Sequence, residues 1–425
     1  MSYMFIGSIL RLPLEITDMV VDFLHDDVKS LQACSLISRS WLPSSRFHLF
    51  RSCTIKDSAQ FRAMFRSVTN LETSRDTGTY IRQLTIAGEG THGPAGGLTL
   101  ETFETLLRGL PRLRRLTIEN IALNNEDDHI PASGLPQDAQ RKAPFALEEL
   151  QLLETKIPKA DYSHLFRILA LFSSIKSLAL ASEWRTVHHK GHPDSYDEHP
   201  HWKIASAPAA APVTVQHLRT FNMPPAVMQA LLVTSIATPA LQTFSYDDHA
   251  LDWTSIGSAN QKLEVHQLGE MIASLPSESL HSLILGPLPI FKNAYEMRRG
   301  LTLLGSVRGL CTFHLHGRWV EPHLAAVFAA LPDTVRDARF VVVGLKGSEG
   351  SRNRFRAFGE AFAPVLRERA QMAFVLDLGV LRRKFPQSFA MLKDRAEKGF
   401  LGLRSLEEGR LRIDDSPKEL EEWSW

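Results

Sequence analysis

The sequence predicts an α/β protein in which an irregular array of parallel strands and outer helices follows a short three-helix motif. Two observations carry this prediction. Between residues 81 and 345 the phrase apolar-x-x-apolar-x-apolar recurs, and helical segments separate its copies. Residues 10–50 instead hold apolar side chains three and four apart, with no long loop. Because one strand–helix unit cannot bury its own apolar face, the copies are expected to stack around a continuous core.

Length and charge bound the classes of function. At 425 residues the chain exceeds one ordinary hydrophobic core, so it forms two or three domains or an elongated array. Its 48 basic and 47 acidic side chains leave a net charge of +1, without the basic excess typical of nucleic-acid binders. We therefore predict no nucleic-acid partner.

Cysteine usage and hydropathy indicate a cytoplasmic or nuclear location. Cys34, Cys53 and Cys311 are widely spaced and no CxxC pair occurs, which argues against a disulfide framework or a cysteine zinc site. The apolar start is short and no basic residue precedes it, unlike a signal peptide. No run approaches the roughly 20 apolar residues of a membrane span, so we expect no membrane partner.

The three-helix motif occupies residues 10–50, within a first domain that we place at 1–50. Pro13 suits the first turn of a helix, where its missing N–H has no intrahelical partner to lose. Asp26 or Asp27 can cap a second helix. A third, short helix is expected to open at 39–41 and to close at Pro43. The apolar face of the first helix comprises Ile16, Met19, Val20, Phe23 and Leu24, and the buried side of the second comprises Leu31, Cys34, Leu36 and Ile37.

A helical linker or cap is expected at 51–80, followed by the strand array at 81–345. In each phrase the last two apolar residues alternate with a polar one, so they point to the same side of a short strand. The phrases are Ile81/Leu84/Ile86, Leu113/Leu116/Ile118, Leu147/Leu150/Leu152, Ile175/Leu178/Leu180, Leu218/Phe221/Met223, Leu241/Phe244/Tyr246, Leu280/Leu283/Leu285, Leu310/Phe313/Leu315 and, as a ninth, Val335/Ala338/Phe340.

Helices and insertions fill the intervals between phrases. Helical spacing marks 100–110, 162–172, 225–236 and 321–331. Two polar or proline-broken stretches, 124–144 and 186–217, read as surface insertions without regular structure. Residues 346–425 are expected to form a C-terminal repeat or cap with a charged tail.

The polar positions within the first strands are candidates for a protein-binding face. Their mixed charge suits a protein surface and points to no small ligand. They are Arg82, Gln83, Thr85, Arg114, Arg115, Thr117, Glu148, Glu149 and Gln151.

Two segments have the residue types of other sites. Residues 88–93 spell GxGxxG after a strand, but Pro94 and further glycines separate the motif from the next helix, so its N-terminus could not reach a pyrophosphate. A flexible repeat loop is the better interpretation. Residues 188–201 contain five histidines at spacings that match no rigid metal scaffold. We predict no metal, no cofactor and no catalytic residue.

The segment from Leu10 to Phe50 resembles an F-box. That pattern runs Leu-Pro-x-Glu-Ile, then a helix ending in Phe-Leu, a further Leu, and Cys-Ser-Leu-Val-x-Arg-x-Trp. Here Ile37 replaces the Val. The matching residues are Leu12, Pro13, Glu15, Ile16, Phe23, Leu24, Leu31, Cys34, Ser35, Leu36, Arg39 and Trp41. The later phrases resemble degenerate leucine-rich repeats, and the combination is similar to the expanded F-box families of fungi.

The resemblance implies the substrate-recognition subunit of an SCF-type Cullin–RING ubiquitin ligase, which is not itself an enzyme. A Skp1-type adaptor, and through it a Cullin, would be its partner, and the repeat region would bind an unknown protein substrate. A non-catalytic scaffold whose helices merely cap the array is the alternative. The implied adaptor-binding residues are Leu12, Pro13, Glu15, Ile16, Phe23, Leu24, Leu31, Cys34, Leu36 and Trp41.

Overall fold

The computed structural model of the chain describes most of the helices and strands in detail. It describes residues 13–69, 77–88, 99–121, 145–155, 162–182, 211–247, 269–286, 304–317, 320, 324–343, 351–400 and 410–416. Contacts between residues divide the chain into two compact units, Met1–Ala122 and Leu123–Trp425. The predicted insertion at 124–144 lies outside the described residues.

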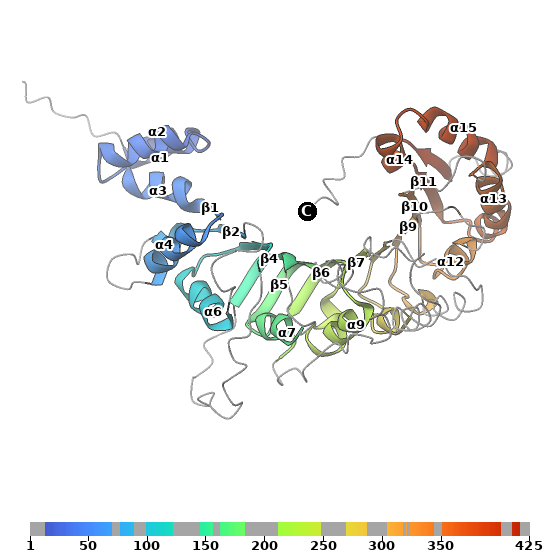
Figure 1. The fold of residues 1–425 in the computed structure, drawn as a ribbon, viewed down its shortest axis with the longest axis horizontal. Helices are drawn as coiled ribbons and strands as arrows, with labels where there is room; N and C mark the ends of the chain where they lie inside the picture. Colours follow the sequence, from blue (N-terminus) through green and yellow to red (C-terminus); the bar gives the residue numbers. More distant parts are fainter. Residues whose placement is uncertain are drawn as a thin grey trace, which may run out of the picture. The chain divides into compact units, whose positions relative to one another are not determined.

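The first unit holds the helical motif and three parallel strands (Figure 1). Strand β1 pairs with β2, and β2 pairs with β3. Its elements are α1 (Leu14–Phe23), α2 (Val28–Ile37), α3 (Leu42–Arg51), β1 (Ser52–Ile55), α4 (Ser58–Thr69), α5 (Thr77–Tyr80), β2 (Gln83–Ala87), α6 (Leu100–Gly109) and β3 (Arg115–Glu119).

Local chemistry sets the bounds of the three N-terminal helices. Asp27 caps α2, because its Oδ1 accepts the backbone N–H groups of Lys29 at 3.1 Å and Ser30 at 3.2 Å. The expectation that a third helix closes at Pro43 is wrong. Helix α3 begins at Leu42 and carries Pro43 in its first turn, where a proline N–H is not needed.

The segment 51–80 contains a strand as well as helices, which corrects the expectation of a purely helical linker. In β1 the residues Cys53 and Ile55 align with Leu84 and Ile86 of β2. Phe50, Cys53 and Ile55 therefore repeat the strand phrase, with a cysteine at a position usually held by leucine. Cysteine is a small hydrophobic residue that packs at this position, but it is not one of the large apolar residues by which the strand phrase is identified in the sequence.

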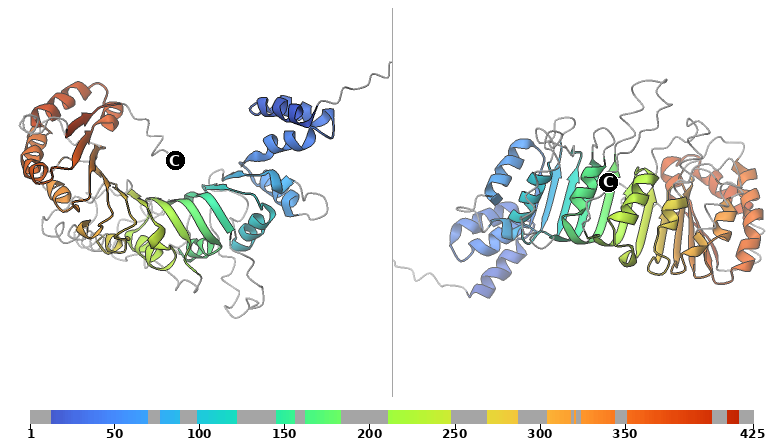
Figure 2. Two further views of the ribbon diagram at one scale, coloured as in Figure 1. Left: turned by 180° about the vertical axis from the view of Figure 1, so that it is seen from behind. Right: turned by 90° about the horizontal axis from the view of Figure 1, so that it is seen from below.

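The second unit holds nine parallel strands in chain order (Figure 1). Helices α7, α9, α12 and α13 lie on the outer side of their curve, and α14 packs near β10 (Figure 2). The strands are β4 (Phe145–Thr155), β5 (Phe172–Ser182), β6 (Thr214–Phe221), β7 (Thr243–Asp247), β8 (Ser282–Leu285), β9 (Thr312–Gly317), β10 (Asp337–Val342), β11 (Ala373–Asp377) and β12 (Leu411–Asp414). The helices are α7 (Ser163–Leu169), α9 (Pro225–Thr234), α12 (Ala325–Ala329), α13 (Ser351–Glu368), α14 (Gly379–Lys384) and α15 (Phe389–Gly399), with 3₁₀ turns η4 (Thr238–Ala240) and η5 (Leu304–Ser306).

The strand phrases form the core of this array, as the sequence predicts, with one exception in register. In β6 it is Leu218 and Thr220, not Phe221 and Met223, that align with Phe244 and Tyr246 of β7. The polar Thr220 obscured this register. It is fully buried, and its hydroxyl donates to the Ser245 carbonyl at 3.2 Å. Strand β6 also begins at Thr214, inside the stretch 186–217 that was expected to lack regular structure.

Phenylalanine replaces leucine as the main core residue in the C-terminal part of the second unit. The ring of Phe362 in α13 stacks on Phe358, with centroids 5.4 Å apart, and lies tilted against Phe374, with centroids 4.3 Å apart. Phe328 of α12 meets Phe362 edge to face at 5.4 Å. Residues 346–425 thus continue the strand–helix pattern in β11 and β12 rather than ending it.

The overall pattern is a mixed α/β fold of parallel strands backed by helices, and it resembles a leucine-rich-repeat solenoid. No described helix has the length and apolar character needed to cross a membrane.

Candidate functional site

Exposed apolar side chains concentrate on the first two helices. Of the eleven large hydrophobic residues that are exposed in the described part of the chain, eight lie on α1, on α2 or at their junction. Phe23 is 88% exposed, Leu36 87% and Met19 66%. We call this set the helical apolar surface: Leu14, Ile16, Met19, Val20, Phe23, Val28, Leu36 and Ile37.

The helices leave this surface exposed because their other sides already fill the core of the motif. Helix α1 buries Thr17 and Val21, and α2 buries Leu31 and Cys34. Both helices contact α3, and the helical apolar surface lies on the sides of α1 and α2 that these contacts do not bury. An apolar patch of this kind on a folded domain usually marks a surface that binds another protein.

Two polar contacts fix α1 against α3 and so hold the helical apolar surface in place. The Ser44 hydroxyl donates to Asp18, and the His48 Nε2 lies 2.7 Å from the Asp22 Oδ1. The His48 ring is almost fully buried, and Phe47 meets it edge to face at 5.1 Å. Helix α1, which carries part of the helical apolar surface, is therefore held in place by α3.

The structure divides the residues that the sequence assigned to adaptor binding. Pro13, Glu15, Ile16, Phe23 and Leu36 are exposed, whereas Leu24 and Trp41 are half-buried. Leu12 lies outside the described residues.

Leu31 and Cys34 are buried inside the motif, with exposed fractions of 0% and 6%, so they support the surface rather than form it. Leu36 and Ile37, expected on the buried side of the second helix, are exposed. Helical spacing identifies an apolar face, but it does not say which face has a partner within the chain. For this reason Leu14, Val28 and Ile37 were not assigned to adaptor binding, although they lie at the same helical spacing and are exposed.

The polar residues expected on the substrate side fall into two groups, one in each unit. In the first unit Gln83 aligns with Arg115 and Thr85 with Thr117, while Arg82 and Arg114 directly precede their strands. All six are exposed or half-buried.

The second group comprises Glu148, Glu149 and Gln151, which lie on β4 in the second unit. The Gln151 amide donates to the Glu149 carboxylate. In the second group only Glu149 and Gln151 share a face of β4, because Glu148 points to the opposite side of the strand.

The first glycine of the GxGxxG motif has a structural use. Gly88 donates its N–H to the Glu119 carbonyl at 2.8 Å and accepts from the Asn120 side chain at 3.2 Å. A Cβ on Gly88 would lie 2.3 Å from the Asn120 carbonyl oxygen. The glycine therefore allows two backbones to approach. Gly90 and Gly93 lie outside the described residues.

The histidine-rich stretch 186–201 also lies outside the described residues. Within the ranges that are described, no three His, Cys, Asp or Glu side chains group as ligands for a metal ion.

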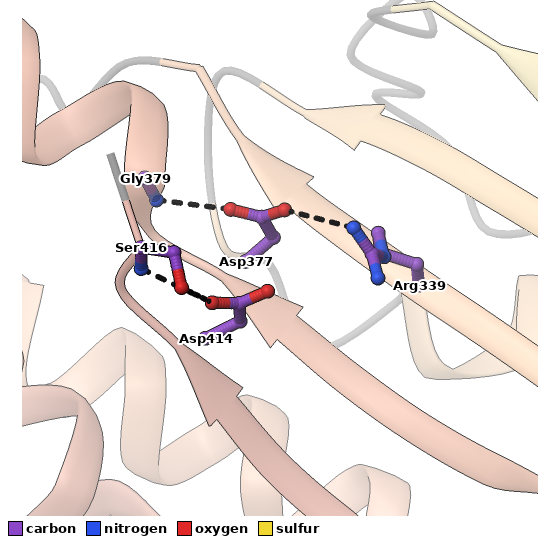
Figure 3. Close-up of polar contacts among 5 residues, drawn as sticks. All are labelled: Arg339, Asp377, Gly379, Asp414 and Ser416. Carbon is purple, nitrogen blue, oxygen red and sulfur yellow. Dashed lines mark hydrogen bonds and ion pairs between the residues drawn. The ribbon is translucent and has the colours of Figure 1, made fainter. Parts of the chain in front are cut away.

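Buried carboxylates in the second unit serve the turns at the ends of strands. In Figure 3, Asp377 accepts the Gly379 N–H at 2.9 Å and pairs with Arg339 at 3.3 Å. Asp414, which aligns with Asp377 on the next strand, accepts the N–H of Ser416 at 3.1 Å and its hydroxyl at 2.7 Å. Both contacts reach a residue two positions ahead, the pattern of an Asx turn. The two carboxylates of this polar cluster therefore close turns at the ends of β11 and β12.

Comparisons with known proteins find similar folds among solved structures. No family model and no curated protein matches this sequence. Among solved structures, the chain is similar to the leucine-rich repeat-containing protein LegL7 from Legionella pneumophila, with 12% identity and a TM-score of 0.39. The match covers 85% of this chain and 89% of that protein.

Proposed function

We propose that this protein is the substrate-recognition subunit of an SCF-type Cullin–RING ubiquitin ligase, and that the helical apolar surface binds the Skp1-type adaptor. The observation that carries the proposal is the exposure of Ile16, Phe23 and Leu36 on α1 and α2. These residues belong to the segment whose sequence resembles an F-box. A partner that covers them would remove from water the apolar area that the motif itself leaves uncovered.

The surface contains side chains of the kind that act as anchors in a stable protein contact. A few large apolar anchors at the centre of an interface commonly carry most of its binding energy, and each contributes roughly 2–4 kcal/mol when it is fully covered. Phe23 and Leu36 are the most exposed of the set and lie on different helices. We assign them as the principal anchors, with Ile16 beside them.

The repeat region would then bind the protein to be ubiquitinated. The polar strand positions of the first unit and the Glu148–Gln151 group of the second unit remain the candidate substrate-binding residues. In this proposal the chain recognises the substrate, and other subunits of the ligase carry out the transfer of ubiquitin.

Co-expression with a Skp1-type adaptor tests the proposal. The double variant Phe23→Ala/Leu36→Ala should lose the adaptor in a pull-down, because two exposed anchors disappear while the buried Leu31 and Cys34 stay in place. The control is Val233→Ala/Met391→Ala, which removes two exposed apolar side chains of the second unit. This control should retain the adaptor.

The alternative is a non-catalytic interaction scaffold in which the three helices only cap the strand array. In that case the wild-type protein would be folded and monomeric and would retain no adaptor. Equal adaptor retention by the wild type and by Phe23→Ala/Leu36→Ala would likewise reject the helical apolar surface as the contact.

A further inference from the structure

The second unit has a small exposed surface that is both apolar and basic. Outside α1, α2 and their junction, the described part of the chain exposes three large hydrophobic side chains, and two of them are Phe385 and Met391. Phe385 directly follows α14 and is 41% exposed, and Met391 lies in the first turn of α15 and is 42% exposed. We call Arg382, Arg383, Phe385 and Met391 the α14–α15 surface.

The basic side chains of this surface come from the end of α14. The helix ends in Arg382, Arg383 and Lys384 and contains no acidic residue. Lys384 is engaged elsewhere, because its Nζ donates to the Val343 carbonyl at 3.2 Å. Arg383 is exposed and forms no ion pair with any described carboxylate. A positive charge next to an exposed aromatic ring is therefore open to a partner.

Both helices hold the chain as it leaves β12. The Asp415 Oδ2 accepts from the Lys393 Nζ of α15 at 2.7 Å, and the Asp415 carbonyl accepts from Arg382 of α14 at 3.1 Å. The hydrogen bond from Lys393 lowers the pKa of Asp415, so this carboxyl is ionised at neutral pH. The Ser416 N–H donates to Asp414 at 3.1 Å. The residues after Ser416 therefore start beside the α14–α15 surface.

The next nine residues, 417–425, have the composition that this surface lacks a partner for. They lie outside the described residues, and their sequence contains three glutamates against one lysine, together with Leu420, Trp423 and Trp425. Nine extended residues reach about 30 Å at most. Helix α15 has 11 residues and is only about 16 Å long, so the whole surface is within reach.

We propose that residues 417–425 bind the α14–α15 surface of their own chain. The glutamates pair with Arg382 and Arg383, and the apolar side chains of the segment cover Phe385 and Met391. A tethered segment is favoured over a separate protein of the same chemistry, because a short tether gives it an effective concentration of the order of millimolar. The bound segment closes this surface to other proteins until it is displaced. The proposal does not depend on the ligase function.

Digestion of the full chain with a glutamate-specific protease tests the proposal. Cleavage after Glu419, Glu421 and Glu422 is followed by the mass of the intact chain, and a synthetic peptide of residues 410–425 is the unprotected reference. Because a protease cuts the released form of a segment, the rate reports the population of that form. The segment in the full chain should be cut at least about ten-fold more slowly than the peptide, and added salt should reduce the difference.

The variant pair is Arg383→Gln/Phe385→Ser against Arg367→Gln/Val233→Ser. Each pair removes one exposed positive charge and one exposed apolar side chain from the second unit, but Arg367 lies on α13 and Val233 on α9. The surface variant should be cut at least about five-fold faster than the wild type, because it loses a charged hydrogen-bond donor and an apolar contact. The control variant should be cut as the wild type is.

Three results would overturn the proposal. The first is a wild-type segment that is cut as fast as the peptide, and the second is equal acceleration in both variant pairs. The third is cleavage that becomes faster when the chain is diluted at a fixed protease concentration, which would mean that the segment binds a second copy. The adaptor pull-down depends on α1 and α2, and both variants should retain the adaptor, so failure of either proposal is a separate result.

Discussion

Helices α1–α2 and helices α13–α15 differ in whether their large apolar side chains are buried. Both groups carry large apolar side chains at helical spacing. Helix α13 buries Phe355, Phe358 and Phe362 completely, packing on α12, α15 and the rings of the strands. Helices α1 and α2 contact α3 and leave Phe23 and Leu36 almost fully exposed.

The difference depends on which element each helix packs against. A helix that packs on a sheet covers the strand residues and has its own apolar face covered in return. Helices α1 and α2 have only another short helix to pack on, and their remaining apolar area stays in contact with water. In this chain the same amphipathic pattern buries apolar side chains in α13 and leaves them exposed in α1 and α2. The predictions below test this contrast.

The largest effect is expected from truncating matched phenylalanines in the two regions. Phe362→Ala should destabilise the second unit by about 3–5 kcal/mol, because it removes a fully buried ring and leaves a cavity among Phe328, Phe358 and Phe374. Phe23→Ala should change stability by less than about 0.5 kcal/mol, because the ring is already exposed. Urea denaturation followed by circular dichroism measures both. Similar losses in the two variants would mean that Phe23 is buried in solution.

This contrast also shows what could be predicted from the sequence. The strand phrases predicted the parallel array because apolar alternation is a local property, and Leu84, Leu116 and Leu150 are buried as expected. The pattern failed where the residue type departed from it. Cys53 hid β1, and Thr220 hid the register of β6, since a buried threonine is indistinguishable in sequence from an exposed one.

The candidate sites were harder to predict because they depend on which residues have partners. Leu36 and Ile37 satisfy helical spacing as well as Leu31 does, yet only Leu31 is buried. The alignment of Arg51 with Arg82 depends on the pairing of β1 with β2, so Arg82 was expected on the binding face while Arg51 was missed. Residues far apart in the chain meet through pairing, and a single sequence does not contain that pairing.

Glycine substitutions give the next largest effect and test how tightly the second unit is packed. A Cβ at Gly286 would lie 2.5 Å from the Cα of Asp247, an approach that backbone atoms cannot relieve cheaply. Gly286→Ala should therefore destabilise the unit by about 1–3 kcal/mol. At Gly305 a Cβ would come only as near as 3.3 Å to a carbonyl oxygen, so Gly305→Ala should cost less. Thermal unfolding of the two variants should show the larger drop for Gly286→Ala.

A third, smaller contrast compares two arginines, Arg369 directly after α13 and Arg82 directly before β2. Arg369 donates to the carbonyls of Ala329 at 2.9 Å and Pro332 at 3.0 Å, at the C-terminal end of α12. Arg369→Gln should destabilise the fold by roughly 1–3 kcal/mol, because several carbonyls lose charged donors. Arg82→Gln should leave stability unchanged or raise it by up to about 1 kcal/mol, because it removes the repulsion between Arg82 and the like charges of Arg51, Arg112 and Arg114.

Melting curves of the two purified variants measure this contrast. Loss of stability in Arg82→Gln equal to that in Arg369→Gln would mean that the Arg82 side chain stabilises the fold.

The smallest effect concerns the pH dependence of the cap that sets α2 in place. The pKa of Asp27 is lowered by the hydrogen bond from the Ser30 hydroxyl, then by the backbone N–H of Ser30, with a smaller contribution from the N–H of Lys29. A carboxyl whose folded pKa is depressed contributes stability above its unfolded pKa, near 3.8, and loses it as pH falls through the lower folded value.

The variant Asp27→Asn keeps a side-chain oxygen that can cap the helix but does not titrate. The wild type should be slightly more stable than this variant at neutral pH, and the difference should shrink as the pH approaches 3.8 and falls below it. Far-ultraviolet circular dichroism during urea titrations at several pH values measures the difference. A gap that stays constant with pH would show that the charge of Asp27 contributes nothing to the stability of α2.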